Sequence, residues 1–70
     1  MGVLILGKII KDRRKELGIT QPHLAELANV SKNTLYKLER GESNPSWAVI
    51  KNLLDVLGLE LNVGIKTINE

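Results

Sequence analysis

The stretch from residue 20 to residue 40 holds two short helical patterns, joined by a turn too tight for anything but a sharp bend. Thr20 suits the N-cap of the first helix, and Pro22 falls in its first turn, where the missing N–H costs nothing. Asn29 follows this helix, and asparagine tolerates the left-handed conformation that ends many helices. Ser31 is a second N-cap. The pattern therefore predicts two helices in immediate succession.

The two predicted helices differ in how much of their surface is apolar. The first repeats apolar residues at helical spacing, at Leu24, Ala25 and Ala28. The second has only Leu35 and Leu38 as large aliphatic side chains, so it can bury only a thin stripe. Its other face carries hydrogen-bond donors and cations, at Lys32, Asn33, Tyr36, Lys37 and Arg40. Such a helix is suited to lie against an anionic ligand.

Small, turn and acidic residues follow one another through this stretch in the order Gln21-x3-Ala25-x4-Val30-Ser31-x3-Leu35-x2-Leu38-Glu39-x-Gly41. This spacing resembles the helix-turn-helix of the Cro/C1-type regulators, the XRE family, which includes phage lambdoid repressors and HipB-like antitoxins. The resemblance runs from about Leu6 to Leu59, and it departs from the family at Asn29, where glycine is usual. It implies an all-α, lambda-repressor-like DNA-binding domain of four to five helices.

Length and composition limit the class of protein. Seventy residues make one small domain, so we expect residues 1–70 to form a single helix-turn-helix unit with its motif at 20–40. The chain has no cysteine and one histidine, which argues against a metal site, and we expect no cofactor. It lacks a carboxylate pair, a Ser–His or Cys–His arrangement and a phosphate-cradling glycine loop, so we expect no enzyme. No apolar run approaches ~20 residues, and the expected location is the cytoplasm.

The charge is unevenly distributed along the chain. The net charge is +2, but residues 1–40 hold eight Lys or Arg against four Asp or Glu, which gives +4. Residues 41–70 hold two against four, which gives −2. The basic part coincides with the motif, as a phosphate-facing surface requires, although an ordinary solvated surface is an equal alternative.

Two further helices flank the motif. The first is predicted from Leu6 to Leu17 and ends at Gly18, with Leu6, Ile10 and Leu17 on one face. The last is predicted from Trp47 to Leu57, between the N-cap Ser46 and Gly58. Its expected core stripe consists of Trp47, Ile50, Leu53, Leu54 and Leu57. Trp47 is thus assigned to the core rather than to a contact.

Two charged residues fall on apolar faces. Arg14 lies four residues after Ile10, and Glu39 lies four residues after Leu35. Both charges should be partly desolvated, and such groups need partners. We predict an Arg14–Glu39 ion pair that locks the first helix to the third, and the family resemblance implies the same pairing. Two separate surface charges are the alternative.

The predicted DNA contacts divide into two groups. A helix in the major groove reads bases through long or bidentate polar side chains near its N-terminal end. Lys32, Asn33 and Lys37 match the family's principal base-contacting positions, and Tyr36 could pack on a thymine methyl group or bind a phosphate. Gln21 matches a family position that binds phosphate beside the positive end of a helix dipole. The other predicted phosphate contacts are Ser31, Thr34, Arg40, Ser43 and Asn44.

The tail changes from helical to alternating periodicity. Residues 59–66 alternate strictly and predict a β-strand, with Leu59, Leu61, Val63 and Ile65 on one side. A single strand in a helical domain has no partner, so the economical solution is the same strand from a second copy, pairing across a dimer. HipB-like antitoxins look similar here. Val49 and Val56 form a second apolar strip, which we assign to the same dimer interface, although ordinary surface apolarity is an equal alternative. A frayed tail is the alternative.

These features predict a homodimeric transcriptional repressor that binds a specific double-stranded DNA sequence. Two-fold pairing would place two reading helices about 34 Å apart on a palindromic operator. The strand and the absence of an effector module favour an antitoxin, whose partner would be a separately encoded toxin protein. The alternative is a protein-interaction module, in which the same helical fold binds a polypeptide.

Overall fold

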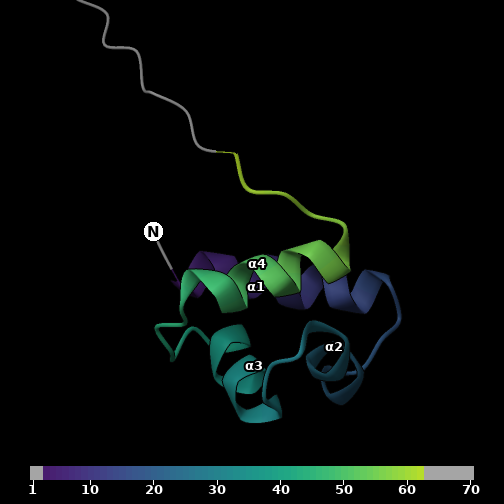
Figure 1. Cartoon of the computed structure of the whole chain (residues 1–70), viewed down its shortest axis with the longest axis horizontal. Coiled ribbons are helices and arrows are strands. Elements are labelled where there is room, and N and C mark those ends of the chain that lie inside the picture. The colour runs from purple at the N-terminus through teal and green to yellow at the C-terminus, as the bar shows by residue number, and fades with distance from the viewer. Residues whose placement is uncertain (1–2, 63–70) are drawn as a thin grey trace, which may run out of the picture.

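The computed structural model describes residues 3–62, which form the four helices α1 (Val3–Glu16), α2 (Gln21–Ala28), α3 (Lys32–Glu39) and α4 (Trp47–Leu57) (Figure 1). Over this range the chain contains no strand, and the predicted all-α class is confirmed. None of these four helices is long and apolar enough to cross a membrane.

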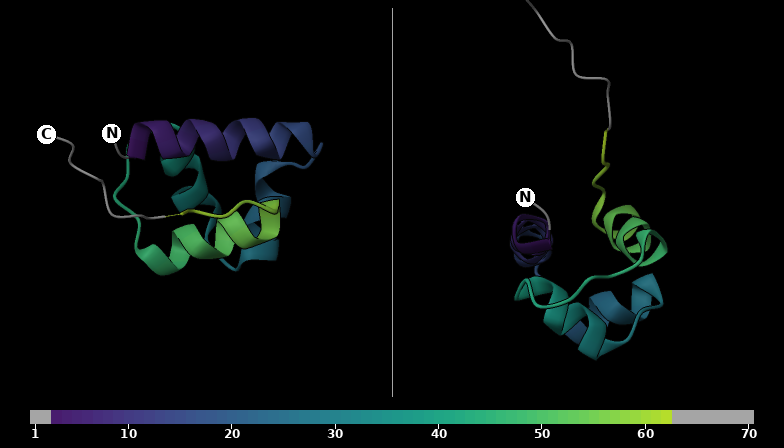
Figure 2. Two further views of the ribbon diagram at one scale, coloured as in Figure 1. Left: turned by 90° about the horizontal axis from the view of Figure 1, so that it is seen from above. Right: turned by 90° about the vertical axis from the view of Figure 1, so that its left-hand side faces the viewer.

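The helices are arranged in two layers. In two perpendicular views α1 and α4 lie side by side, and α2 and α3 lie together beneath them (Figures 1 and 2). The principal contacts join α1 to α3 and α2 to α4. The helix-turn-helix pair α2–α3 is therefore held from behind by the two flanking helices.

The bend between α2 and α3 is made by the residues that the sequence singles out. Thr20 Oγ1 accepts a hydrogen bond from the His23 N–H at 3.2 Å, and Ser31 Oγ accepts one from the Thr34 N–H at 3.0 Å. Between them Asn29 adopts the left-handed conformation, with φ 58°. Both predicted caps and the predicted left-handed asparagine are confirmed.

The core consists of aliphatic side chains from all four helices, namely Ile10, Leu24, Ala25, Ala28, Leu35, Leu38, Leu53, Leu54 and Leu57. All of them belong to the apolar faces predicted from helical spacing. A fully buried leucine or isoleucine contributes ~1.5–3 kcal/mol relative to an exposed one. This shared core fixes the orientation of α3, so the polar face of that helix stays exposed.

Two residues at the ends of predicted apolar faces, Leu17 and Trp47, are exposed, contrary to expectation. Leu17 is 44% exposed, because α1 ends at Glu16 and the chain turns away at Gly18, whose φ is +70°. Trp47 is 56% exposed, so its assignment to the core is wrong. It is the first residue of α4, and the residues of that helix that pack against the core begin at Val49.

The tail leaves the domain after Gly58. Leu59 packs against the core, and Leu61 is exposed. Residues 59–62 have no regular secondary structure in this single chain, and Val63 and Ile65 lie outside the described residues. The strand over 59–66 and its pairing across a dimer therefore stay predictions. Val49 and Val56, predicted to face a partner, are half-buried against the domain's own core.

Candidate nucleic-acid interface

Helix α3 is anchored by a buried ion pair. Arg14 donates to Glu39 through two nitrogens, with Nε 2.8 Å from Oε2 and Nη2 3.0 Å from Oε1. The third guanidinium nitrogen donates to the Ile19 carbonyl at 2.9 Å. The side chains are 11% and 2% exposed, and the hydrogen bond to Glu39 raises the pKa of Arg14 above its ordinary value. The ion pair predicted from the sequence is present.

This anchoring sorts the residues of α3 into two faces. The buried face consists of Leu35, Leu38 and Glu39. The residues predicted to reach DNA bases are all exposed, at Lys32, Asn33, Tyr36 and Lys37. Amines, an amide and a phenol therefore occupy the side of α3 that faces away from the molecule.

The C-terminal end of this face carries a further cation, Arg40. The Arg40 guanidinium lies over the Tyr36 ring, 5.4 Å from its centroid. Its Nε also donates to Glu42 Oε2 at 3.1 Å, and this hydrogen bond raises the pKa of Arg40. A DNA phosphate at this position would compete with Glu42 for the guanidinium. Stacking on Tyr36 would keep the Arg40 guanidinium in place while a phosphate replaces Glu42 as its partner.

The predicted phosphate contacts are not equally accessible. At the start of α3 the Ser31 hydroxyl donates a hydrogen bond to Thr34 Oγ1 at 2.7 Å. Asn44 is exposed on the loop after α3. Ser43 Oγ is buried and has no hydrogen-bond partner among the described residues, so it would have to turn outward to reach a phosphate. Gln21 is half-buried, and its Nε2 donates to Glu39 Oε1 at 2.9 Å. Spacing alone could not have revealed this last bond.

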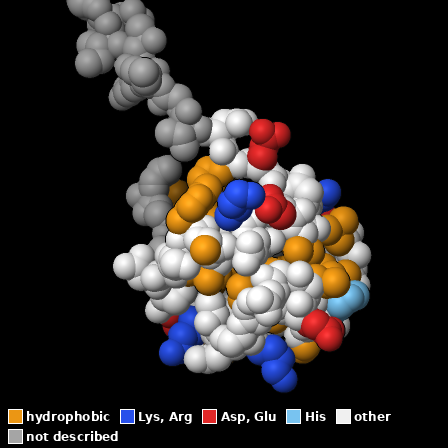
Figure 3. Space-filling model, in the orientation of Figure 1, with side chains coloured by type: hydrophobic (Ala, Val, Ile, Leu, Met, Phe, Trp, Pro, Cys, Tyr) orange, Lys and Arg blue, Asp and Glu red, His pale blue; other side chains and the backbone are white. Residues whose placement is uncertain are grey.

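Charged side chains of both signs are mixed over the face drawn in the space-filling view (Figure 3). Lys and Arg side chains project at the lower edge, where the ribbon in the same orientation has α3, and others lie on the upper part (Figures 1 and 3). Acidic side chains occur on the upper part, on the side of α4 and the tail, and also near the lower edge (Figure 3).

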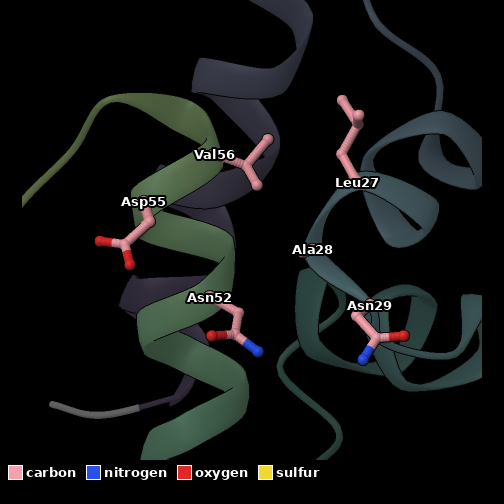
Figure 4. Close-up of a pocket in the computed structure, with 6 residues that line it drawn as sticks. All are labelled: Leu27, Ala28, Asn29, Asn52, Asp55 and Val56. Atoms are coloured by element: carbon pink, nitrogen blue, oxygen red, sulfur yellow. The ribbon is translucent and has the colours of Figure 1, made fainter.

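A shallow groove of about 310 Å³ lies between the C-terminal end of α2 and the outer face of α4, lined by Leu27, Ala28, Asn29, Asn52, Asp55 and Val56. Leu27 and Val56 stand on its opposite sides (Figure 4). Leu27 is 54% exposed and was not among the predicted interface residues. The signal for it in the sequence was weak, because a single leucine beside an apolar stripe is ordinary on a helix surface.

Two short helices that meet at a capped bend, with the second anchored by leucines and covered on its open side by donors, define a helix-turn-helix DNA-binding domain. The helix-turn-helix family profile matches residues 10–63, and the chain belongs to this family, of the XRE type.

Similar proteins come from archaea and from a phage. A protein of Methanococcus maripaludis, provisionally named an HTH-type transcriptional regulatory protein, is 40% identical over 63 residues, which are 90% of this chain and 19% of the relative. An uncharacterized HTH-type transcriptional regulator of Methanothermobacter thermautotrophicus is 40% identical over 52 residues, which are 74% of this chain and 75% of the relative. The immunity repressor protein of Bacillus phage phi105 is 37% identical, over 93% of this chain and 46% of its own length. The chain thus spans about a fifth of the methanococcal relative.

Proposed function

We propose that the chain is a single helix-turn-helix domain that binds a specific double-stranded DNA sequence as a homodimeric transcriptional repressor. The observation that carries this proposal is the exposed polar face of α3, supported from behind by Leu35, Leu38 and the buried Glu39. Its similarity to a phage immunity repressor supports the repressor role. A domain this small would repress by occluding a promoter in the cytoplasm, where a bacterial or archaeal chromosome lies.

Base recognition would come from the exposed face of α3. Lys32 and Lys37 suit the guanine O6 and N7 acceptors, and Asn33 suits the adenine N6 and N7 pair. Tyr36 would pack on a thymine methyl group. All four side chains are exposed, so none needs to move out of the core to reach a base edge.

The phosphate contacts would lie on either side of α3. Gln21 at the start of α2, Ser31 and Thr34 at the start of α3, and Arg40 and Asn44 beyond its end would bind the backbone, together with Ser43 if its hydroxyl turns outward. Such contacts fix the register of the protein on the duplex but read no sequence directly.

A dimer would double the short segment of DNA that one α3 can read. Leu61, exposed beyond α4, supports a partner for the tail, as does the alternation that continues to Ile65 in the sequence. Two α3 helices about 34 Å apart would match the half-sites of a palindromic operator. An antitoxin is the subtype that we favour, with a toxin protein as the second partner.

The direct test is fluorescence anisotropy with a duplex from the chain's own promoter region, at two salt concentrations. Lys32→Ala should weaken binding, and the affinity of the wild-type chain should fall steeply as salt rises, because released counterions drive much of the binding. Lys51→Ala is the matched control, since this lysine lies on α4 in an ion pair with Asp55. Equal affinity of all three proteins would refute the assignment of α3.

The second candidate function is a protein-interaction module, favoured by the groove beside Leu27. In that case Leu27→Ser would abolish capture of the partner polypeptide, while Lys32→Ala would leave it unchanged. The repressor hypothesis predicts that Lys32→Ala weakens binding to DNA and that Leu27→Ser does not.

A further inference from the structure

The carboxylate of Glu39 joins three helices at one point. It accepts two hydrogen bonds from Arg14 of α1 and one from Gln21 of α2, all between 2.8 and 3.0 Å. With its side chain only 2% exposed, it cannot itself touch DNA. The two bonds from Arg14 already anchor α3 to α1, so this anchoring does not require the bond from Gln21.

The chemistry of the Glu39 carboxylate determines which end of the Gln21 amide faces it. An ionised carboxylate can only accept hydrogen bonds, so the NH2 group of Gln21, and not its carbonyl oxygen, must turn toward Glu39. An amide NH2 carries two protons. One is bound by Glu39 Oε1, and among the described residues the other has no acceptor.

We infer that Glu39 is a positioning residue for DNA binding: it holds the Gln21 amide so that its second N–H is offered to a DNA phosphate at the start of α2. This inference depends on the proposed function, since it deepens the phosphate contact assigned to Gln21. A free glutamine side chain loses rotamer entropy when it binds, whereas one already held by a carboxylate has lost most of it beforehand. Arg14 supports the arrangement by fixing the Glu39 carboxylate with two hydrogen bonds.

The alternative is that the Gln21–Glu39 bond merely fastens α2 to α3. A double-mutant cycle separates the two roles, because a fastening role would lower stability but would not couple the affinities. Arg14→Met with Glu39→Met replaces the buried pair by apolar side chains of similar length, and such replacements often preserve stability. Gln21→Met removes the amide in either background.

We expect Gln21→Met to weaken DNA binding about tenfold in the otherwise wild-type chain. The Arg14→Met/Glu39→Met variant should lose a similar factor, and adding Gln21→Met to it should cost little more. Asn44→Ala is the matched control, since this proposed phosphate contact has no bond to Glu39, and it should cost the same in both backgrounds. An unchanged affinity after replacement of the pair, or an equal cost of Gln21→Met in both backgrounds, would overturn the inference.

A measurement on the wild-type chain covers the case in which the variant without the ion pair does not fold. The NMR signals of the two Gln21 Nε2 protons are assigned by their absence from the spectrum of Gln21→Met. In the free protein the proton bound by Glu39 should be displaced downfield from its position in a free glutamine amide, and the duplex should shift the signal of the outward proton. Two signals at the ordinary positions of a free glutamine amide, or signals that the duplex leaves unmoved, would contradict the inference. A wild-type chain that binds no duplex at low salt would instead refute the proposed function, and the inference with it.

Discussion

Gly7 of α1 faces the main-chain carbonyl of Leu38 in α3 with no room for a side chain between them. A Cβ at Gly7 would overlap the carbonyl oxygen and would lie 3.3 Å from Glu39 Cα. The same carbonyl accepts the Gly41 N–H at 2.9 Å, where α3 ends. Seven residues further along α1, Arg14 binds the Glu39 carboxylate. Two points of α1 thus hold the C-terminal end of α3.

The first prediction concerns this close contact. Gly7→Ala should destabilise the domain by ~1–3 kcal/mol, because the added methyl group has to push α1 away from α3. Elsewhere in a helix the same substitution stabilises by ~0.5–1 kcal/mol, so the expected sign is opposite to that of intrinsic helix propensity. Urea denaturation measures the difference. A more stable Gly7→Ala variant would contradict the close packing of the two helices.

The second prediction concerns the ion pair. Arg14→Met alone should cost ~3–5 kcal/mol, because it leaves the Glu39 carboxylate buried without its cation. Adding Glu39→Met should restore most of that loss. Denaturation of the single and double variants checks both statements. If the double variant were less stable than Arg14→Met, the pair would not be the reason for the loss.

The third prediction uses the single tryptophan of the chain. Trp47 is 56% exposed, so its fluorescence should resemble that of a solvated indole and should be quenched readily by acrylamide. Trp47→Ala should cost less than ~1 kcal/mol, because little apolar area is lost, whereas Leu53→Ala should cost ~2–5 kcal/mol. A blue-shifted emission that acrylamide quenches poorly, measured on the monomer, would show instead that Trp47 is buried in the core.

The fourth prediction concerns oligomerisation. A chain that ends at Asn62 keeps all four helices and the packing of Leu59 on the core, but it loses Val63 and Ile65. It should fold, as judged by circular dichroism, and sediment as a monomer, while the full chain sediments as a dimer. A truncated chain that still sediments as a dimer would show that the dimer interface lies on the four-helix domain and not on the tail. The groove beside Leu27 would then be the first candidate for that interface.

The parts of this fold that could be predicted are those with local causes. Caps and left-handed positions depend on one or two neighbouring residues, so Thr20, Asn29 and Ser31 could be assigned from the sequence. Helical spacing gave the buried faces for the same reason, and it also showed that Arg14 and Glu39 needed partners.

Properties that depend on how helices meet could not be predicted in this way. Trp47 and Leu17 lie on apolar stripes but at helix ends, and only the packing of the helices determines that they are exposed. Arg13 of α1 donates its Nε to the carbonyl of Leu57 at the end of α4 at 2.9 Å, and the spacing of residues within one helix does not indicate such a contact. The Gln21–Glu39 bond likewise depends on the three-dimensional approach of α2 and α3.

The central claim is that the exposed face of α3 reads DNA sequence, and selection of preferred duplexes from a randomised pool tests it most directly. The wild-type chain should select one half-site, and Lys32→Gln with Asn33→Gln should select a different one, because each side chain pairs with its own pattern of base donors and acceptors. Arg13→Gln, away from α3, should leave the selected sequence unchanged. Selection of the same half-site by the wild-type chain and by the Lys32→Gln/Asn33→Gln variant, or of none by the wild-type chain, would contradict the claim.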